Sequence, residues 1–418
     1  MVRVPGRILG WARFKGIAKM RKPLAILAVL GALFLPAEAA PRHKLLVISV
    51  DGLDWRYLRD ADALGLKLPN IRKLLSRSQV ADGVVGVWPT VTWPSHTAML
   101  TGEPPFRHGI LANAGGPLDI TQSYWSATKI KVPTLTQCAM AAGLTTAGVN
   151  WPVTVNANLT WNLPEVYAKR NGDSSDLATV DRYGTPGLVA EIARTYPSFA
   201  YRWLDDRTRT LATLYLLKKR QPDLLLLHLA ELDSEAHEEG PFTPAANAVA
   251  ERSDELIGDI LRALPKGYDV ALVSDHGFEK IDRTANLKAV AAAAGVTGAM
   301  DITPGMVATT DPQVAQWLRA QSGKSDVGRE IPPAEVKRFA GQDVAAAFEP
   351  APHVTFASTG PVHGTPSNAG THGFWPTRSD YHSIFALSGP GIQAGELGEI
   401  EMVSLKDRFA QVLGLSCR

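Results

Sequence analysis

Apolar runs that alternate with helical patterns constrain the fold of this chain most. The run Lys44–Val50 (KLLVISV) is followed directly by Asp51, and the run DVALVS ends in Asp275. A third run, DLLLLHLA, comes shortly before Asp233. Buried strands separated by helices predict an α/β fold, in which a mainly parallel central sheet carries helices on both faces. Ligands gather beyond the carboxyl ends of the strands in such sheets, so we expect these three aspartates to lie together.

Helices and strands are expected to alternate along the rest of the chain. We expect further helices at Leu68–Ser76, Pro94–Thr101, Thr134–Ala142, Leu204–Lys219 and Pro244–Leu264. We expect further strands at Ala81–Val87 and Thr145–Val149. Two stretches interrupt this rhythm. Residues 151–187 are polar and predicted to form a loop or cap insertion, and residues 291–367 are predicted to form a smaller lobe.

The composition of the 418 residues is that of a globular protein with a sizeable core. Hydrophobic residues make up 45% and charged residues 20% of the chain. The net charge is +2, and part of the basic excess lies in the first 22 residues. No nucleic-acid-binding surface is therefore indicated.

The N-terminus has the three regions of a secretory signal peptide. An apolar run at residues 24–36 follows Lys19, Arg21 and Lys22, and it ends in Ala37-Glu38-Ala39-Ala40. We expect a signal peptide at residues 1–39, with Met20 as an alternative start, and a mature domain at residues 40–418. An uncleaved anchor is the other interpretation, but the run is short for a membrane span. The mature protein is expected to be periplasmic or secreted, without a stable membrane span.

The chain has two cysteines, Cys138 and Cys417. An exported protein could pair them, but the sequence leaves their pairing open, as it does the oligomeric state.

Aspartate and histidine occur together in a pattern that indicates a metal site. Asp233 and His237 are four residues apart, so one helical turn could direct both at one ion. His276 follows Asp275 directly, and His372 lies between small residues in GTHGFW. Carboxylate and imidazole are ligands that suit zinc, although manganese and iron also accept them. Each pair alone could be a turn or a solvated face; their combination favours the metal.

Thr92, in the segment PTVTWPSH, precedes a predicted helix N-terminus. Unpaired backbone N–H groups and the helix dipole would stabilise an alkoxide or a phosphate there. An N-cap threonine is the structural alternative.

Five segments together resemble a known family: VDGLDW, PTVTWPSHTAMLTGEPPFRHGILAN, LDSEAH, SDHGF and GTHGFW. The chain is similar, from about Lys44 to Leu415, to the type I phosphodiesterase/nucleotide pyrophosphatase family of the alkaline phosphatase superfamily. The resemblance implies an alkaline phosphatase-like catalytic domain with two divalent cations, expected to be zinc. It implies that one cation is held by Asp51, Thr92, Asp275 and His276, and the other by Asp233, His237 and His372. It further implies that Thr92 is the nucleophile and that Asn113 contacts a non-bridging phosphoryl oxygen.

The chain departs from the family pattern in two places. Trp93 and Ser95 stand where many members have phenylalanine and asparagine. The aromatic clamp for a nucleobase has no certain counterpart, although Trp125, Trp151 and Tyr167 lie in suitable stretches. His96 matches the family motif, and we interpret it as a structural residue.

The resemblance predicts a metal-dependent phosphodiesterase or nucleotide pyrophosphatase. It would cleave small phosphodiester or nucleotide substrates through a phospho-threonine intermediate. Neutral Asn113 favours diesters, whereas a nearby cation would shift the preference towards monoesters. The candidate cations are Lys129, Lys131, Lys169 and Arg170. The alternatives are an alkaline phosphomonoesterase or phosphonate hydrolase of the same superfamily and, from a different class, a non-catalytic exported binding protein. A cytosolic manganese mutase does not fit the signal peptide or Thr92.

Overall fold

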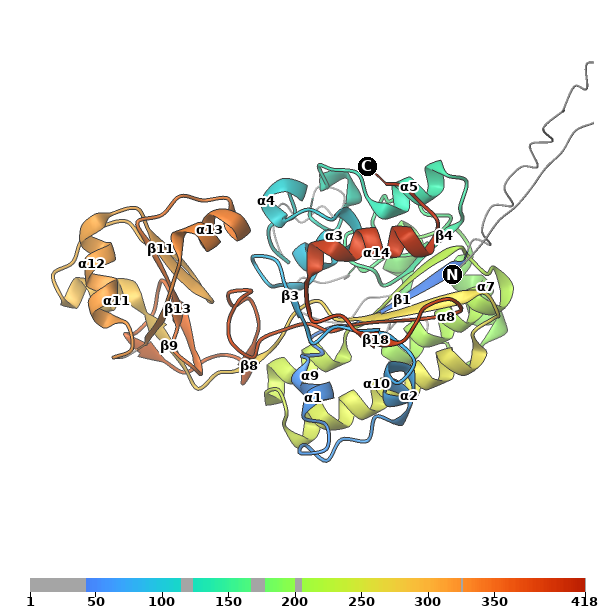
Figure 1. Ribbon diagram of the computed structural model, residues 1–418, viewed down its shortest axis with the longest axis horizontal. Coiled ribbons are helices and arrows are strands. Elements are labelled where there is room, and N and C mark those ends of the chain that lie inside the picture. Colours follow the sequence, from blue (N-terminus) through green and yellow to red (C-terminus); the bar gives the residue numbers. More distant parts are fainter. Residues whose placement is uncertain (1–42, 114–122, 167–176, 200–204, 325, 418) are drawn as a thin grey trace, which may run out of the picture. The chain divides into compact units, whose positions relative to one another are not determined.

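An eight-stranded sheet organises the fold (Figure 1). The computed structural model describes residues 43–113, 123–166, 177–199, 205–324 and 326–417. In spatial order the strands are β18 (Gly395–Glu396), β2 (Gln79–Val80), β17 (Phe385–Ser388), β7 (Tyr268–Val273), β1 (Lys44–Val50), β6 (Leu224–Leu229), β4 (Thr146–Val149) and β5 (Trp161–Leu163). The five strands from β7 to β5 are parallel, and β17 is antiparallel to both of its neighbours. The predicted fold class, a mainly parallel central sheet, is thus confirmed.

The central strands are apolar on both faces because helices cover both faces. Along β1, Leu46 and Ile48 pack into one hydrophobic core, and Leu45 and Val47 pack into another. One core is closed by helices α2 (Pro69–Leu75), α7 (Leu188–Thr195), α8 (Asp206–Lys219) and α10 (Pro244–Ala263). The other is closed by α3 (Thr92–Thr101), α5 (Leu135–Ala141) and α14 (Leu405–Val412). The two groups of helices lie on opposite sides of the sheet in Figure 1.

The shorter elements of this part of the chain connect the larger ones. They are the helices α1 (Arg56–Arg59), α4 (Pro105–His108), α6 (Leu177–Tyr183) and α9 (Glu231–Glu239), the 3₁₀ turns η1 (Ala127–Lys129) and η2 (Met402–Ser404), and the paired strands β3 (Gly83–Val85) with β19 (Glu399–Glu401) and β8 (Glu279–Lys280) with β16 (Gly370–Thr371). Two of these elements, α9 and β16, lead into the candidate site described below.

A second sheet has its own core. Its strands are β10 (Asp301–Thr303), β11 (Met306–Thr309), β13 (Ala346–Pro350) and β12 (Val327–Ile331), flanked by α11 (Leu287–Ala293), α12 (Pro312–Gln321) and α13 (Pro333–Ala340). A three-stranded sheet of β14 (Val354–Ala357), β9 (Arg283–Asn286) and β15 (His363–Gly364) adjoins it in sequence. Residues 291–367 thus contain sheet and helix, and the described part of residues 151–187 contains β5 and α6.

Three expected elements had boundaries wrong by two residues or more, and one of them is the helix expected from Leu204, which begins at Asp206. The helix expected from Pro94 begins at Thr92, because Val91 is extended (φ −131°) and proline is tolerated in the first helical turn. Thr92 is therefore the first helical residue rather than an N-cap. The strand expected at 81–87 is shortened to β3, and β2 forms separately before it.

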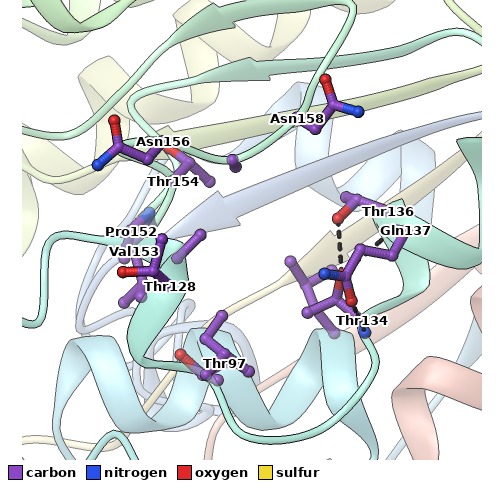
Figure 2. Close-up of a pocket in the computed structure, with 14 residues that line it drawn as sticks. Thr97, Thr128, Thr134, Thr136, Gln137, Pro152, Val153, Thr154, Asn156 and Asn158 are labelled. Atoms are coloured by element: carbon purple, nitrogen blue, oxygen red, sulfur yellow. Dashed lines mark hydrogen bonds between the residues drawn. The ribbon is translucent and has the colours of Figure 1, made fainter.

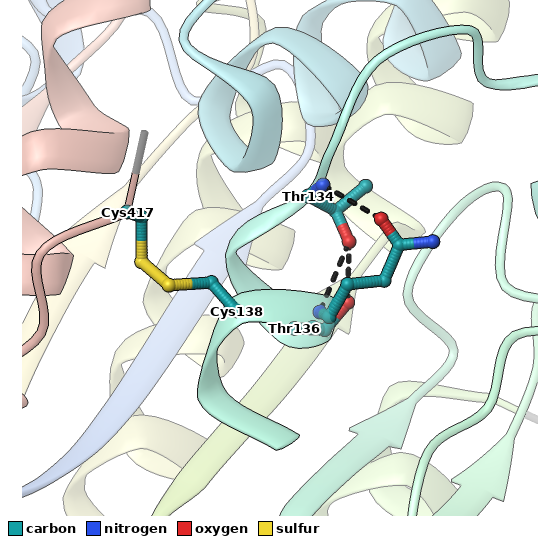
Figure 3. The surroundings of a disulfide bond; sticks show 5 residues. Thr134, Thr136, Cys138 and Cys417 are labelled. Atoms are coloured by element: carbon teal, nitrogen blue, oxygen red, sulfur yellow. Dashed lines mark hydrogen bonds between the residues drawn. A yellow bond between two sulfur atoms is a disulfide. The ribbon is translucent and has the colours of Figure 1, made fainter. Parts of the chain in front are cut away.

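The pairing that the sequence left open is visible in the structure. Cys138 of α5 forms a disulfide with Cys417, and their Cα atoms lie 5.8 Å apart (Figure 3). This bond ties the segment after α14 to the helix layer that covers the sheet.

The predicted signal peptide, residues 1–39, lies outside the described residues. Within the part of the chain that the structure describes, none of the helices has the length and apolarity that crossing a membrane requires.

Candidate active site

The register of the central strands places Asp51 and Asp275 at the same level. Ser49 of β1 lies opposite Val273 of β7, and each aspartate comes two residues later. The backbone N–H of Gly52 donates to Oδ1 of Asp275 at 3.1 Å, which joins the two strand ends. Gly52 has φ +66°, and a Cβ atom there would lie 3.3 Å from the Cα of Asp233. A glycine is needed here because the backbone turns in the left-handed region against a neighbouring helix.

The short helix α9 contributes the next two side chains. Asp233 and His237 are one turn apart, and Asp233 Oδ2 lies 3.6 Å from His237 Nε2. The N-terminus of α9 has no cap from its own residues. Instead, the carboxylate of Asp206 on α8 accepts the backbone N–H groups of Ala230 and Glu231 at 2.9 and 3.0 Å. A buried side chain from another helix therefore fixes the start of α9.

The pairing of strand β16 with strand β8 brings His372 to the site. Thr371 lies opposite Glu279, so His372 reaches the loop that follows β7. Its ring stacks on His276 with 3.8 Å between centroids. His372 Nε2 lies 3.5 Å from Asp233 Oδ1. The sheet edge, α9 and a loop from late in the chain thus meet at one point.

Two sets of donor atoms could hold metal ions. The ligand atoms of Asp233, His237 and His372 lie within 4.8 Å of one another, and those of Asp51, Asp233 and His276 do as well. The first set is one of the two predicted from the family resemblance. In the second, Asp233 occupies the place expected for Asp275, whose Oδ2 nevertheless lies 3.1 Å from His276 Nε2.

Unsatisfied polar atoms point into this cluster. Among the described residues, the buried atoms without a hydrogen-bond partner include Asp51 Oδ1, Asp233 Oδ1, Asp275 Oδ2 and His276 Nε2. Leaving a buried donor or acceptor without a partner costs about 1–3 kcal/mol, and more for a charged group. A cation would satisfy all four, so the donor set fits divalent metal ions.

Backbone carbonyl groups orient the three histidines. His237 Nδ1 lies 2.9 Å from Gly370 O. His276 Nδ1 lies 3.2 Å from Gly277 O, and His372 Nδ1 lies 3.3 Å from Thr90 O. A carbonyl can only accept, so each Nδ1 carries the proton and each Nε2 offers its lone pair to the cluster. Hydrogen bonds of this kind orient metal-bound histidines in proteins.

The electrostatics of the cluster also favour added positive charge. Burial raises the pKa of Asp51 to about 8. Burial and the neighbouring Asp51 raise the pKa of Asp233 to about 7 and that of Asp275 well above its usual value. Burial lowers the pKa of His372 well below its ordinary value. Three carboxylates in so small a space resist ionisation, and a bound cation reverses that preference.

Thr92 lies at the N-terminus of α3 beside Asn113. Asn113 Oδ1 accepts the backbone N–H of Trp93 at 2.9 Å, and its Nδ2 lies 3.2 Å from Thr92 Oγ1. Because Oδ1 is engaged by an N–H group, the amide presents its donor to the Thr92 hydroxyl. The predicted nucleophile and the predicted phosphoryl contact are therefore in direct contact.

His96 connects Thr92 to strand β1 and has no free ligand atom. Its Nδ1 lies 2.8 Å from Thr92 O, and its Nε2 lies 2.9 Å from Ser49 Oγ. Both ring nitrogens are thus engaged, as expected for a structural residue.

The aromatic and basic candidates lie in different surroundings. Trp151 is fully buried against His96, whereas half-buried Trp125 packs on Trp93 with 5.7 Å between ring centroids. The side chain of Lys131 lies across Gly109. Tyr167, Lys169 and Arg170 lie outside the described residues.

A separate pocket of about 170 Å³ lies beside α3 (Figure 2). It is lined mainly by threonine and amide side chains, among them Thr97, Thr136 and Asn156. Of the residues that the structure describes, none of the candidate ligands lines it, nor do Thr92 and Asn113. This pocket is therefore distinct from the candidate site at the strand ends.

The sequence did not reveal two residues that support the site, Asp206 and His228. Nε2 of His228 lies 3.0 Å from Asp51 Oδ2. A signal was present for His228, because it is the one polar residue in the strand LLLLHL. Asp206 gave none, since its partners lie 24 and 25 residues away in sequence.

Known proteins resemble this chain in sequence and in fold. Human ectonucleotide pyrophosphatase/phosphodiesterase family member 7 is 24% identical over 440 residues, which cover 95% of this chain and 87% of that protein. A venom phosphodiesterase of Macrovipera lebetinus is 26% identical over 247 residues, which cover 57% of this chain and 26% of that protein. The chain thus spans about a quarter of that venom relative's length.

A similar structure is that of murine ectonucleotide pyrophosphatase/phosphodiesterase 5, solved as an inactive variant in complex with AMP. It matches with a TM-score of 0.63 and 16% identity, over 90% of this chain and 96% of that chain. This likeness shows the fold. The type I phosphodiesterase/nucleotide pyrophosphatase family matches residues 45–355, from the first central strand into the second lobe. The chain therefore belongs to the type I phosphodiesterase/nucleotide pyrophosphatase family.

Proposed function

We propose that this protein is a metal-dependent phosphodiesterase or nucleotide pyrophosphatase that works through a phospho-threonine intermediate. One observation carries the proposal: buried carboxylate and imidazole atoms without partners converge where His372 contacts Thr90 O, two residues before Thr92 at the N-terminus of α3. Family membership supports the same reaction class.

The ligands would divide between two divalent cations, with zinc as the expected ion. Asp51, Asp275, His276 and Thr92 would hold one, and Asp233, His237 and His372 the other. Three carboxylates and a threonine alkoxide together balance the charge of two such ions. When bound, the cations would supply the positive charge that acidifies the Thr92 hydroxyl and stabilises the leaving oxygen.

The residues of the chain would then act in two steps. Thr92 Oγ attacks phosphorus, so that the Thr92–phosphorus ester forms while the bond to the leaving oxygen breaks. The Thr92 hydroxyl loses its proton in this step, and the leaving oxygen takes up one. Asn113 Nδ2 donates to a non-bridging oxygen, where negative charge develops. Water then hydrolyses the phospho-threonine, releasing a phosphomonoester and returning the proton to Thr92.

The access to the site fits a small substrate approaching from one end. The side chains of Asp275 and His276 are 0% exposed, whereas those of Asp233 and His237 are 16% and 25% exposed. The leaving group would therefore lie on the Asp233 side. Asn113 is a neutral contact, which favours a diester or an anhydride over a doubly charged monoester.

We also propose that the protein acts outside the cytosol. The apolar run near the N-terminus and the disulfide between Cys138 and Cys417 support this location, because disulfides persist in oxidising compartments.

A substrate panel with metal-replete protein tests the reaction class. Values of kcat/KM are measured for bis-p-nitrophenyl phosphate, p-nitrophenyl phosphate, a phosphonate monoester and a dinucleotide pyrophosphate. We expect the diester or the anhydride to be the best substrate. A preference for p-nitrophenyl phosphate or for the phosphonate would move the protein to another branch of the superfamily, and no turnover of any of them would contradict the proposal.

A further inference from the structure

His228 lies on the penultimate position of β6, between leucines that fill the core. It is 0% exposed, and the register places it opposite Ser49 of β1. Along β6, Leu224 and Leu226 share its face and pack into the hydrophobic core under α3. Burial of an imidazole in such a place is unfavourable unless its ring nitrogens have partners.

Both ring nitrogens of His228 have partners. Nε2 lies 3.0 Å from Asp51 Oδ2. On the opposite side of the ring, Nδ1 lies 3.3 Å from Asn150 Nδ2 and 3.1 Å from Asn150 O. An ionised Asp51 can only accept, so in that state Nε2 of His228 carries the proton and Nδ1 accepts from the Asn150 amide N–H. The ring of His96 lies 4.5 Å from that of His228, between centroids, and restricts its tilt. The imidazole is therefore held on three sides and directed at Asp51.

Asn150 has a backbone conformation suited to this role. It is fully buried and has φ +54°, a left-handed conformation that asparagine tolerates better than most residues. Its backbone N–H donates to Leu163 O at 2.7 Å, which anchors the turn to β5. Asn150 thus reaches His228 from a fixed loop.

The contact of His228 decides which oxygen of Asp51 faces the cluster. Oδ2 is engaged by His228, and Oδ1 lies 3.3 Å from His276 Nε2 without a hydrogen-bond partner among the described residues. Backbone groups orient Asp275, His237, His276 and His372. Asp51 is oriented by the buried side chain of His228, so its orientation can be tested by substitution.

We propose that His228 is a positioning residue that donates its Nε2–H to Asp51 Oδ2 and so holds Oδ1 ready to bind one divalent cation. The inference rests on the proposed two-metal function. Hydrogen-bonding partners of metal ligands typically contribute 10- to 100-fold to metal affinity. His228 touches neither substrate nor reacting atoms, so its effect is on the metal and, through it, on turnover.

Three substitutions separate the hydrogen bond from the packing. His228→Leu matches the neighbouring residues of β6 but has no donor. His228→Gln keeps an N–H group about as far from the backbone as Nε2 of histidine. His228→Asn keeps one only about as far from the backbone as Nδ1. His43 provides the matched control, because its Nδ1 lies 3.0 Å from Asp269 Oδ2 in a pair at the amino ends of the strands. His43→Leu removes a histidine–aspartate pair of the same kind without touching the site.

The measurement is zinc affinity by competition with a chromophoric chelator, together with the melting temperature of each purified variant. We expect His228→Leu and His228→Asn to bind one of two zinc ions about 10- to 100-fold more weakly, while His228→Gln and His43→Leu bind both like the wild type. Turnover of His228→Leu at saturating zinc should recover towards the wild-type value.

Two results would overturn the inference: wild-type zinc affinity in His228→Leu, or an equal loss in the leucine and glutamine variants. A wild-type protein that binds no zinc and cleaves no diester would instead contradict the proposed function itself. The two failures are therefore distinguishable.

Discussion

At the scale of single residues, buried histidines of this chain fall into two kinds. His276 leaves its Nε2 without a partner, as a metal ligand would. His108 uses both nitrogens: Nε2 lies 3.2 Å from Pro94 O, and Nδ1 accepts the backbone N–H of Ile110 at 3.1 Å. The number of engaged ring nitrogens, rather than burial, thus distinguishes the candidate ligand His276 from the structural His108.

His108 should make the protein sensitive to acid. Burial lowers its pKa from 6.5 to about 4. As the pH falls below about 6.5, the unfolded chain takes up this proton first, so the free energy of unfolding decreases until the pH reaches the folded-state pKa. The slope for one group is at most about 1.4 kcal/mol per pH unit.

The measurement compares wild type and His108→Gln, both zinc-loaded, by urea unfolding at about pH 7 and about pH 5. Glutamine keeps a donor for Pro94 O and does not titrate. We expect the wild type to lose up to about 2 kcal/mol more than the variant over this range. Equal losses would show that His108 titrates alike in both states.

At the scale of elements, helix α9 depends on another helix for its first turn. Asp206 of α8 accepts two backbone N–H groups there and also pairs with Arg209 at 2.7 Å. Asp206 and Arg209 are buried, whereas Ala230 and Glu231 are half-buried. The side chains of Asp233 and His237 are therefore positioned by a carboxylate that never touches them.

Removal of that carboxylate should weaken both stability and metal binding. We expect Asp206→Ala to lower the free energy of unfolding by about 3 kcal/mol, because it breaks a buried ion pair and two hydrogen bonds. Zinc held by Asp233, His237 and His372 should bind about tenfold more weakly. Asp205→Ala is the matched control: it removes the N-cap of α8 and should cost about 1 kcal/mol without changing zinc affinity. Equal zinc affinity in both variants would contradict this role of Asp206.

Sequence patterns predicted the elements better than the contacts between them. Strand β1 has the expected bounds, because an apolar run followed by Asp51-Gly52 marks both the strand and its end. The start of α3 was missed by two residues, since Pro94 is compatible with several positions of a first turn. Asp206 and His228 could not be predicted, because their roles depend on contacts between segments distant in sequence.

At the scale of the whole molecule, the disulfide between Cys138 and Cys417 closes a loop over more than half of the chain. It joins residues separated by 279 positions and attaches the C-terminal segment to α5. Five of the candidate ligands, Asp233, His237, Asp275, His276 and His372, lie within the loop that it closes, whereas Asp51 and Thr92 precede it. Stability of the entire unit, rather than local geometry at the site, should therefore depend on it.

Loss of the disulfide should lower stability and leave the chemistry intact. We expect the double substitution Cys138→Ala with Cys417→Ala to reduce the free energy of unfolding by about 2–5 kcal/mol, because the unfolded chain gains freedom. Calorimetry with and without reductant checks this result, and kcat at low temperature should not change. An oxidised and a reduced protein that melt at the same temperature would contradict it.

The most direct test of the two-metal phosphodiesterase assignment is the hydrolysis of bis-p-nitrophenyl phosphate by the wild type and Thr92→Ala, each measured after chelation and after restored zinc. We predict that the wild type loses turnover on chelation and regains it with zinc. The Thr92→Ala variant should bind the same two zinc ions yet keep less than about a tenth of the wild-type kcat. A variant that exceeds this limit, or a wild type that stays active without metal, would contradict the account.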